Sequence, residues 1–361
     1  MRVAVLGVGL IGGSIGLAAR SRLGAEVIGH DPDPGTVEAA LARGAIDRGT
    51  AGPGEAVEGA EVVFCAAPVG ELASLVAEAL RAAGPDTAVS DVGSTKRALV
   101  EALGEDERFI GGHPLAGAET AGVQNAREEL FEGARWFLTP APGTSGVLYD
   151  RLQRTVGGLG ARPQALDAAA HDRLMATVSH LPHVIANVVA SQARSELLDD
   201  SSRLPEVGPS LRDATRVAGS NPAVWADIFS SNREALADAV EGAAGRLREA
   251  SELLRDGDRE ALASWQAAAA EDRRSLLEAE ATAGPSHELR VVVRNRPGTV
   301  AALALALGDA GVNIEDMALY PAQDMTTGAV TIGVAGAGAA ERAAEVIRGL
   351  GHTVTVASAG E

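Results

Sequence analysis

The feature that most constrains the fold is a set of three glycines near the amino terminus. Gly7, Gly9 and Gly12 have the spacing G-x-G-x-x-G and directly follow the apolar run Arg2–Leu6. In a βαβ unit the first glycine permits a tight turn, the second lets a pyrophosphate approach the backbone, and the third lets a helix pack closely on the strand. The motif therefore predicts a strand, a dinucleotide-binding turn and a helix, in that order.

An acidic residue at the end of the next predicted strand completes this pattern. Asp31 follows the run Glu26–His30, where a carboxylate can accept hydrogen bonds from ribose hydroxyls. No Arg or Lys follows closely to bind a 2′-phosphate, and Asp33 would repel one, so we expect NAD rather than NADP. The alternative is a solvated aspartate in a plain turn. The residues expected to contact NAD are Gly7, Gly9, Leu10, Ile11, Gly12, Asp31, Ala66, Ala67 and Pro68.

Residues 1–166 show short runs rich in Val and Ile that alternate with Ala-rich helical stretches. Such alternation predicts an α/β domain with a mainly parallel, doubly wound sheet of the Rossmann type. The predicted strands are Arg2–Leu6, Glu26–His30, Glu61–Ala66, Thr87–Asp91, Phe109–Gly112 and Arg135–Thr139.

Residues 167–283 lose the strand pattern and are expected to form an all-helical domain. Asn221 and Pro222 make a favourable helix start, because Asn caps free amides and Pro fits the first turn. An apolar stripe at steps of four and seven then predicts one helix of about nine turns. A stripe this long needs a partner to cover it, so we expect a homodimer. The stripe consists of Trp225, Phe229, Leu236, Val240, Leu247 and Leu254.

A short linker precedes a third pattern, in residues 287–361. Its elements follow the order strand, helix, strand, strand, helix, strand, which predicts a ferredoxin-like (βαββαβ) module. The predicted strands are Glu288–Val293, Val312–Tyr320, Gly328–Val334 and Thr353–Ala357, and the predicted helices are Thr299–Ala310 and Ala339–Leu350.

Charge and composition argue against several kinds of partner. Acidic side chains outnumber basic ones by 49 to 31, and no run of Lys and Arg could neutralise a stretch of phosphates, so we expect no nucleic-acid partner. The single cysteine, Cys65, excludes a disulfide within the chain, which suits a reducing compartment. We also expect no segment apolar enough to span a bilayer, and therefore no membrane and a cytoplasmic location.

Four polar segments interrupt otherwise apolar or turn-like stretches. Residues 91–96 and 111–117 follow predicted strands, so both should open at the carboxyl edge of the sheet, where ligands bind in such folds. Residues 179–183 and 212–216 lie in the helical region. With the glycine motif, these segments resemble the prephenate and arogenate dehydrogenase family, over residues 1–282. Residues 287–361, with Arg296-Pro297-Gly298 and Gly311-Val312-Asn313-Ile314, resemble an ACT domain, a module that binds regulatory amino acids.

The resemblance implies NAD-dependent oxidation and decarboxylation of prephenate, or of its amino analogue arogenate, on the route to tyrosine. His113 would be the general base that accepts the proton of the substrate's C4 hydroxyl. Ser94 would support the same hydroxyl, although a helix cap is its alternative. Arg216 would bind a carboxylate through two parallel hydrogen bonds. His183 and Ser179, four residues apart on one helix face, would lie toward the substrate's side chain, with His183 among the catalytic residues.

Other positions complete the expected sites. Glu119 and Trp225 match substrate-site positions of the family, and for Trp225 core packing is the favoured alternative. In the ACT-like segment we expect tyrosine, the end product, to bind as an effector at Pro297, Gly298 and Asn313. No metal is expected, because a zinc site on His180 and His183 would lack a third ligand.

Two other functions fit the sequence less well. A β-hydroxy acid dehydrogenase would need a catalytic lysine in the helical domain, and no lysine follows Lys96. A non-catalytic sensor of NAD and an amino acid would not need His113 and Arg216 together.

Overall fold

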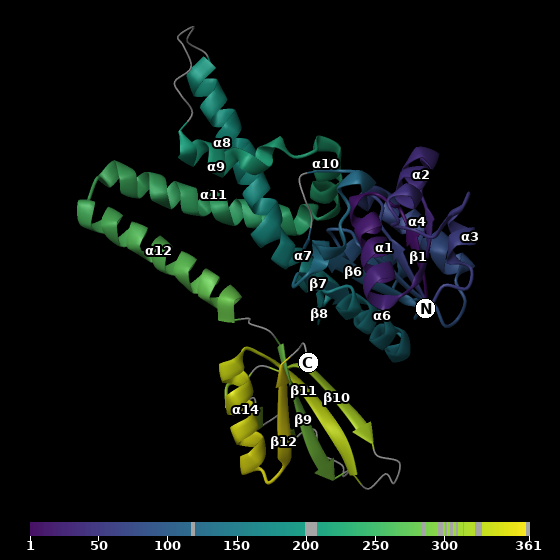
Figure 1. The fold of residues 1–361 in the computed structure, drawn as a ribbon. Coiled ribbons are helices and arrows are strands. Elements are labelled where there is room, and N and C mark those ends of the chain that lie inside the picture. Colours follow the sequence, from purple (N-terminus) through teal and green to yellow (C-terminus); the bar gives the residue numbers. More distant parts are fainter. Residues whose placement is uncertain are drawn as a thin grey trace. The chain divides into compact units, whose positions relative to one another are not determined.

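The computed structural model describes residues 1–116, 120–198, 208–282, 286–294, 299, 302–303, 306–307, 310–312, 314–321 and 327–358. The chain forms two compact units, Met1–Leu247 and Arg248–Glu361. Figure 1 shows the first unit in purple to teal and the second in green to yellow.

An eight-stranded sheet forms the centre of the first unit (Figure 1). Its order is β3-β2-β1-β4-β5-β6-β7-β8, and all neighbouring strands are parallel except β6 and β7. This confirms the expected Rossmann-like sheet. The strands are β1 (Arg2–Leu6), β2 (Glu26–His30), β3 (Arg48–Gly49), β4 (Val62–Cys65), β5 (Ala88–Asp91), β6 (Phe109–Pro114), β7 (Arg135–Thr139) and β8 (Arg162–Ala165).

The direction of chain progression reverses between β1 and β4. The chain runs outward from β1 to β3 and then returns to place β4 on the other side of β1. In open α/β sheets the crevice at the carboxyl ends of two such strands is the usual ligand site. Here Gly7 follows β1 and Ala66 follows β4, and the amide of Ala66 donates to the carbonyl of Leu6 at 2.6 Å.

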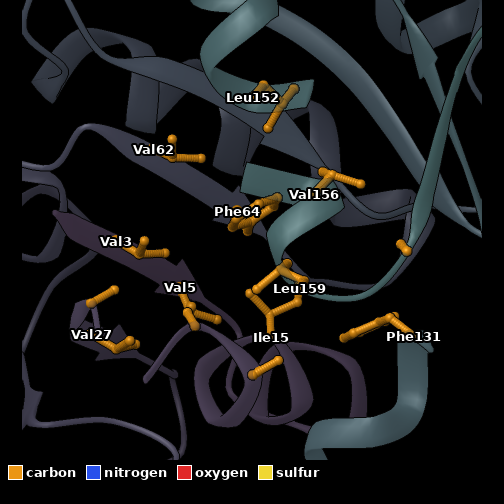
Figure 2. Packing of buried hydrophobic residues seen from close by; sticks show 14 of the residues in the cluster. Val3, Val5, Ile15, Val27, Val62, Phe64, Phe131, Leu152, Val156 and Leu159 are labelled. Carbon is orange, nitrogen blue, oxygen red and sulfur yellow. The ribbon is translucent and has the colours of Figure 1, made fainter. Parts of the chain in front are cut away.

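Helices cover both faces of the sheet, because its central strands are apolar on both sides. Val3 and Val5 of β1 lie in one core cluster, and Ala4 and Leu6 lie in the other. Figure 2 shows the first cluster, where the strands pack against Ile15, Leu152 and other helical side chains. The helices of this region are α1 (Leu10–Leu23), α2 (Pro34–Ala42), α3 (Pro53–Val57), α4 (Val69–Ala82), α5 (Arg97–Leu103) and α6 (Gly146–Gly158), with short turns η1 (Val123–Asn125) and η2 (Glu128–Phe131).

From residue 168 the chain is helical, as expected. Asp167 caps the first helix through its side chain, which accepts from the amide of Ala170 at 2.8 Å. A π-turn lies just before Pro182, consistent with a disturbance of the helix by that proline. The elements are α7 (Ala168–Met175), η3 (Ala176–His180), α8 (Leu181–Leu198), α9 (Pro209–Thr215), η4 (Arg216–Gly219), α10 (Pro222–Ser231), α11 (Arg233–Asp256) and α12 (Arg259–Thr282).

The prediction of one nine-turn helix after Asn221 is wrong. Asn221 does cap a helix, with its side chain accepting from the amide of Ala223 at 3.0 Å, but that helix ends at Ser231. Asn232 interrupts it because its side-chain amide donates to the carbonyl of Asp172 at 2.8 Å and contacts Nδ1 of His180 at 3.1 Å. The apolar stripe is therefore divided between α10 and α11.

One stretch among the described residues, Ala168–Glu196, has the length and the mean hydropathy, 1.2, of a membrane-crossing helix. Charged residues, among them Asp172 and Arg173, interrupt the stretch, so it contains no uninterrupted apolar run of that length. Length and composition alone carry this observation. Asp172 in this stretch is buried and binds backbone amides of residues 96 and 97, so this side of the helix packs against protein.

The second unit contains a four-stranded antiparallel sheet of order β10-β11-β9-β12. Leu289, Val291, Val330 and Ile332 lie in its core together with Ile347 of the covering helix. Its elements are β9 (Ser286–Arg294), β10 (Ile314–Pro321), β11 (Thr327–Ala335), α14 (Ala337–Gly349) and β12 (Thr353–Ser358). The effector candidates Pro297, Gly298 and Asn313 lie outside the described residues, and the predicted helix Thr299–Ala310 is described only in part.

Candidate active site

The glycine motif lies at the carboxyl end of β1, next to the end of β4. Gly7 has φ of +93°, and a Cβ there would collide with the carbonyl of Ala66. A Cβ on Gly12 would collide with the carbonyl of Gly7. By contrast, no atom lies within 4 Å of the position that a Cβ on Gly9 would take. Two of the glycines thus serve the fold of the turn, and the third leaves space for a ligand.

The amino terminus of α1 directly follows the glycine turn. Gly9 is the N-cap, no side chain caps the helix, and its first turn contains no acidic residue. Such a terminus attracts phosphate, because free amides and the helix dipole both favour an anion. Leu10 and Ile11 form the first turn and are partly buried. The residues present therefore fit a dinucleotide pyrophosphate.

Asp31 lies beside the glycine turn at the end of β2. Its carboxylate accepts from the amide of Val8 and from the amide of Asp33, both at 3.0 Å. These bonds fix the carboxylate beside the glycine turn, while the residue stays partly exposed. Asp33 instead caps α2, and its hydrogen bonds from Thr36 and Gly35 lower the pKa of its carboxyl.

A separate pocket of about 360 Å³ brings together four of the residues predicted from sequence: Ser94, His113, Ser179 and Trp225. They come from the ends of β5 and β6 and from the helices after residue 168, so the pocket joins the sheet to the helical region. The rest of its lining is mostly apolar. It consists of Pro114, Leu115, Ala116, Met175, Val178, His180 and Ile228.

His113 ends up in the last part of β6, a strand longer than predicted, and is buried. Its Nδ1 lies 2.9 Å from Nε2 of His171. Burial lowers the pKa of His113 well below its usual range, and the basic groups of His171 and Lys96 act in the same direction. The imidazole is therefore neutral at neutral pH, as a general base must be.

Trp225 lines the pocket and stacks on His183, which is not part of the lining. Their rings stack with centroids 3.4 Å apart, and Nδ1 of His183 donates to the carbonyl of Ser179 at 3.0 Å. Trp225 thus lies at the pocket rather than in a core. Burial lowers the pKa of His183, and the positive charge of Arg216 contributes to the same shift.

Two of the described residues that were predicted from sequence, His183 and Arg216, do not line the pocket. Arg216 is exposed at the start of η4, near enough for its charge to act on His183. Glu119 lies outside the described residues.

The helix-cap alternative for Ser94 is wrong. Lys96 is the N-cap of α5, and no side chain of that loop caps the helix. Instead the carboxylate of Asp172 accepts from the amides of Lys96 and Arg97, at 2.8 and 3.0 Å. Ser94 is left to face the pocket.

Comparison with known proteins agrees with this geometry. The family model "Prephenate dehydrogenase, nucleotide-binding domain" matches residues 15–164, and "Prephenate dehydrogenase, dimerization domain" matches residues 167–267. The prephenate dehydrogenase of Bacillus subtilis is 30% identical over 339 residues, covering 91% of each chain. This chain belongs to the prephenate dehydrogenase family.

Solved structures of this family have the same fold. Prephenate dehydrogenase from A. aeolicus, in complex with hydroxyphenyl propionate and NAD+, superposes with a TM-score of 0.68 at 29% identity, covering 76% of this chain and 98% of that one. Arogenate dehydrogenase from Synechocystis gives a TM-score of 0.69 at 27% identity, covering 76% of this chain and 100% of that one.

Sequence reasoning missed several polar residues that support the site of this prephenate dehydrogenase family member. Asp91 and Lys96 form a fully buried ion pair, and Asp91 also accepts from the amides of Gly93 and Gly112, at 2.8 and 3.0 Å. These bonds tie the Ser94 loop to the strand that carries His113. The available signal was Lys96 itself, a lysine within the polar segment 91–96.

Proposed function

We propose that this protein is an NAD-dependent prephenate dehydrogenase, which converts prephenate to 4-hydroxyphenylpyruvate, CO2 and NADH. The observation that carries the proposal is a buried, neutral His113 in a pocket at the carboxyl edge of a Rossmann-like sheet, in a chain of this family. The oxidation needs a base at that place, and a neutral imidazole is suited to accept the proton.

The chemistry assigns one task to each group. When bound, NAD accepts a hydride from C4 of the ring. His113 takes the proton of the C4 hydroxyl and returns it to the same oxygen once loss of CO2 has made the ring a phenolate. Cleavage of the bond from C1 to the carboxylate releases CO2, and its electron pair completes the aromatic ring. Ser94 is proposed to bind the hydroxyl and hold it toward His113.

For NAD, we propose contacts from the glycine turn (Gly7, Gly9 and Gly12), the first turn of α1 (Leu10 and Ile11), Asp31, and the end of β4 (Ala66, Ala67 and Pro68). The open space at Gly9 and the free amides of α1 support this assignment. So does the A. aeolicus relative, whose solved structure contains NAD+.

For the substrate, we propose that Arg216 binds a carboxylate and that Ser179, His183, Trp225 and Glu119 surround the side chain. A dianion requires a cation, and a guanidinium can bind a carboxylate with two hydrogen bonds. Arogenate, in which an ammonium group replaces the keto group of the side chain, is the alternative substrate. Kinetics with both substrates decide between them.

Direct assay tests the proposed function. The purified protein with NAD and prephenate should produce NADH steadily. His113→Asn should lower kcat by about two to four powers of ten, because the proton acceptor is lost. His352→Asn, a change in the second unit, is the matched control and should keep the wild-type rate. No NADH from the wild type, or a loss below about tenfold in His113→Asn, would contradict the proposal.

We further propose three domains: residues 1–166, 167–283 and 287–361. The ranges of the two family models support the first boundary.

In the last domain the strand order β12-β9-β11-β10 is the 4-1-3-2 order of a ferredoxin-like module, which supports an ACT domain there. We propose tyrosine as its effector, at Pro297, Gly298 and Asn313, in a cytoplasmic homodimer. Tyrosine should then change the rate or the thermal midpoint in the same preparation.

A further inference from the structure

Three buried side chains form a continuous hydrogen-bonded row behind the pocket. Nδ1 of His113 lies 2.9 Å from Nε2 of His171, and Nδ1 of His171 lies 2.8 Å from Oδ1 of Asp172. The exposed fractions are 8%, 0% and 3%, respectively. The row crosses from the end of β6 to α7, so it links the nucleotide-binding sheet to the helical region.

The hydrogen-bond chemistry of this row allows only one arrangement of protons in the neutral state. An ionised carboxylate only accepts, so Nδ1 of His171 must carry a hydrogen. Nε2 of neutral His171 is then an acceptor, and Nδ1 of His113 must carry the hydrogen between the two rings. The lone pair of His113 is therefore on Nε2, the one ring nitrogen that the row leaves available to the pocket.

Asp172 is held rigidly enough to impose this arrangement. Its two carboxylate oxygens accept from the amides of Lys96 and Arg97 at the start of α5, and its carbonyl accepts from the side chain of Asn232. Although burial raises the pKa of Asp172, the hydrogen bonds from His171 and these amides outweigh it and lower the pKa below its usual range. The carboxylate is thus ionised and fixed. Phe137 packs edge-on against His171, with ring centroids 5.5 Å apart.

We propose that His171 and Asp172 are positioning residues for the reaction: Asp172 orients His171, and His171 orients His113 so that Nε2 is the base. When that nitrogen accepts the substrate proton, Nδ1 of His113 stays bonded to His171, and the charge of Asp172 stabilises the imidazolium through the intervening ring. The carboxylate of a serine-protease triad acts similarly on its histidine, without an intervening ring. This inference rests on the proposed function, since it presupposes His113 as base.

The kinetic test uses variants that leave Asp172 in place to bind α5. His171→Phe removes the acceptor for His113 and should lower kcat about tenfold to a thousandfold, with the KM for NAD unchanged. His171→Gln can present a carboxamide oxygen to His113, so it should recover part of that loss. Asp167→Asn is the matched control, because Asp167 caps the same helix outside the row, and it should keep wild-type kinetics. Wild-type kcat in folded His171→Phe would overturn the proposal.

A spectroscopic measurement separates this proposal from the proposed function. In protein labelled with ¹⁵N-histidine, the free enzyme at neutral pH should show His113 and His171 as tautomers protonated at Nδ1, whereas free imidazole side chains prefer Nε2. Asp172→Asn should disturb both signals, and Asp167→Asn neither. If His113 in the wild type is protonated at Nε2, the proposed arrangement of protons in the row is wrong, even if NADH is produced. Absence of activity with the expected tautomers would instead reject the proposed function alone.

Discussion

At the residue scale, the site depends on histidines kept neutral by burial. The pKa of His113 lies well below its usual range, chiefly through burial, and the same cause lowers the pKa of His180 to about 4. A neutral ring can accept a proton at working pH without first losing one. The structure therefore provides a base whose availability extends to mildly acidic solution.

This gives a prediction for pH. The acid limb of kcat/KM, which reports the free enzyme's base, should lie well below pH 6.5, the usual value for histidine. The measurement is a pH profile between neutral and mildly acidic pH with saturating NAD. An acid limb at or above pH 6.5 would contradict the assignment of His113 as the base.

Unfolding has to be followed in the same samples, because the lowered pKa values of these histidines also make the stability of the fold depend on pH. Between pH 6.5 and about 4 the unfolded chain binds protons on His113 and His180 that the folded chain does not. The free energy of unfolding must therefore decrease as pH falls through this window. Circular dichroism at each pH distinguishes loss of fold from protonation of the base.

The site residues that could be predicted are those whose neighbours in the sequence mark them. Residues whose role depends on contacts with distant parts of the chain could not be predicted. His113 and Ser94 follow apolar strands, so their place at the sheet edge could be predicted. The role of His171 depends on a ring 58 positions away in the chain, and Asp172 binds amides 75 and 76 positions away. No periodicity records such pairings, and they appear only in the folded chain.

At the element scale, the same limit explains the errors in helix and strand bounds. The apolar stripe after Asn221 is continuous in sequence, yet the bonds of Asn232 to Asp172 and His180 break the helix. The strand β8 was not predicted because its residues are polar or partly exposed and alternate weakly. The strand β6 extends to Pro114 because β7 pairs with it in antiparallel fashion. Tertiary partners decided each of these bounds.

The turn between β1 and α1 gives a prediction that separates fold from cofactor binding. Gly9→Ala adds a methyl group where no protein atom lies within 4 Å, so the thermal midpoint should stay near wild type while NAD binding weakens by at least tenfold. Gly12→Ala should instead lower the thermal midpoint, because its methyl group meets the carbonyl of Gly7. Calorimetric titration with NAD and thermal melts measure the two effects.

Gly143→Ala is the control for this pair. Its Cβ also has no neighbour within 4 Å, but the residue lies in the loop between β7 and α6 and not in the glycine turn, so both measurements should match wild type. Equal loss of stability in Gly9→Ala and Gly12→Ala would show that Gly9 serves the fold rather than the ligand.

At the scale of the whole molecule, the second half of the apolar stripe is uncovered. Leu236 of α11 is buried, whereas Leu247 and Leu254 on the same helix are 62% and 63% exposed, and Trp265 of α12 is 50% exposed. Large apolar side chains left exposed along a long helix favour an interaction surface there. The family model for residues 167–267 describes a dimerization domain, which fits a second copy of the chain as the partner.

The proposed homodimer can be tested on this stripe. Each fully buried leucine contributes about 1.5–3 kcal/mol, and in a symmetric dimer every substitution occurs twice. Leu254→Asp should therefore weaken the dimer about a hundredfold or more and give monomers in sedimentation at micromolar concentration. Val147→Asp, at a position 71% exposed on α6, is the control and should remain dimeric. A wild-type protein that sediments as a monomer would exclude the dimer, and an undisturbed dimer in Leu254→Asp would place its interface elsewhere.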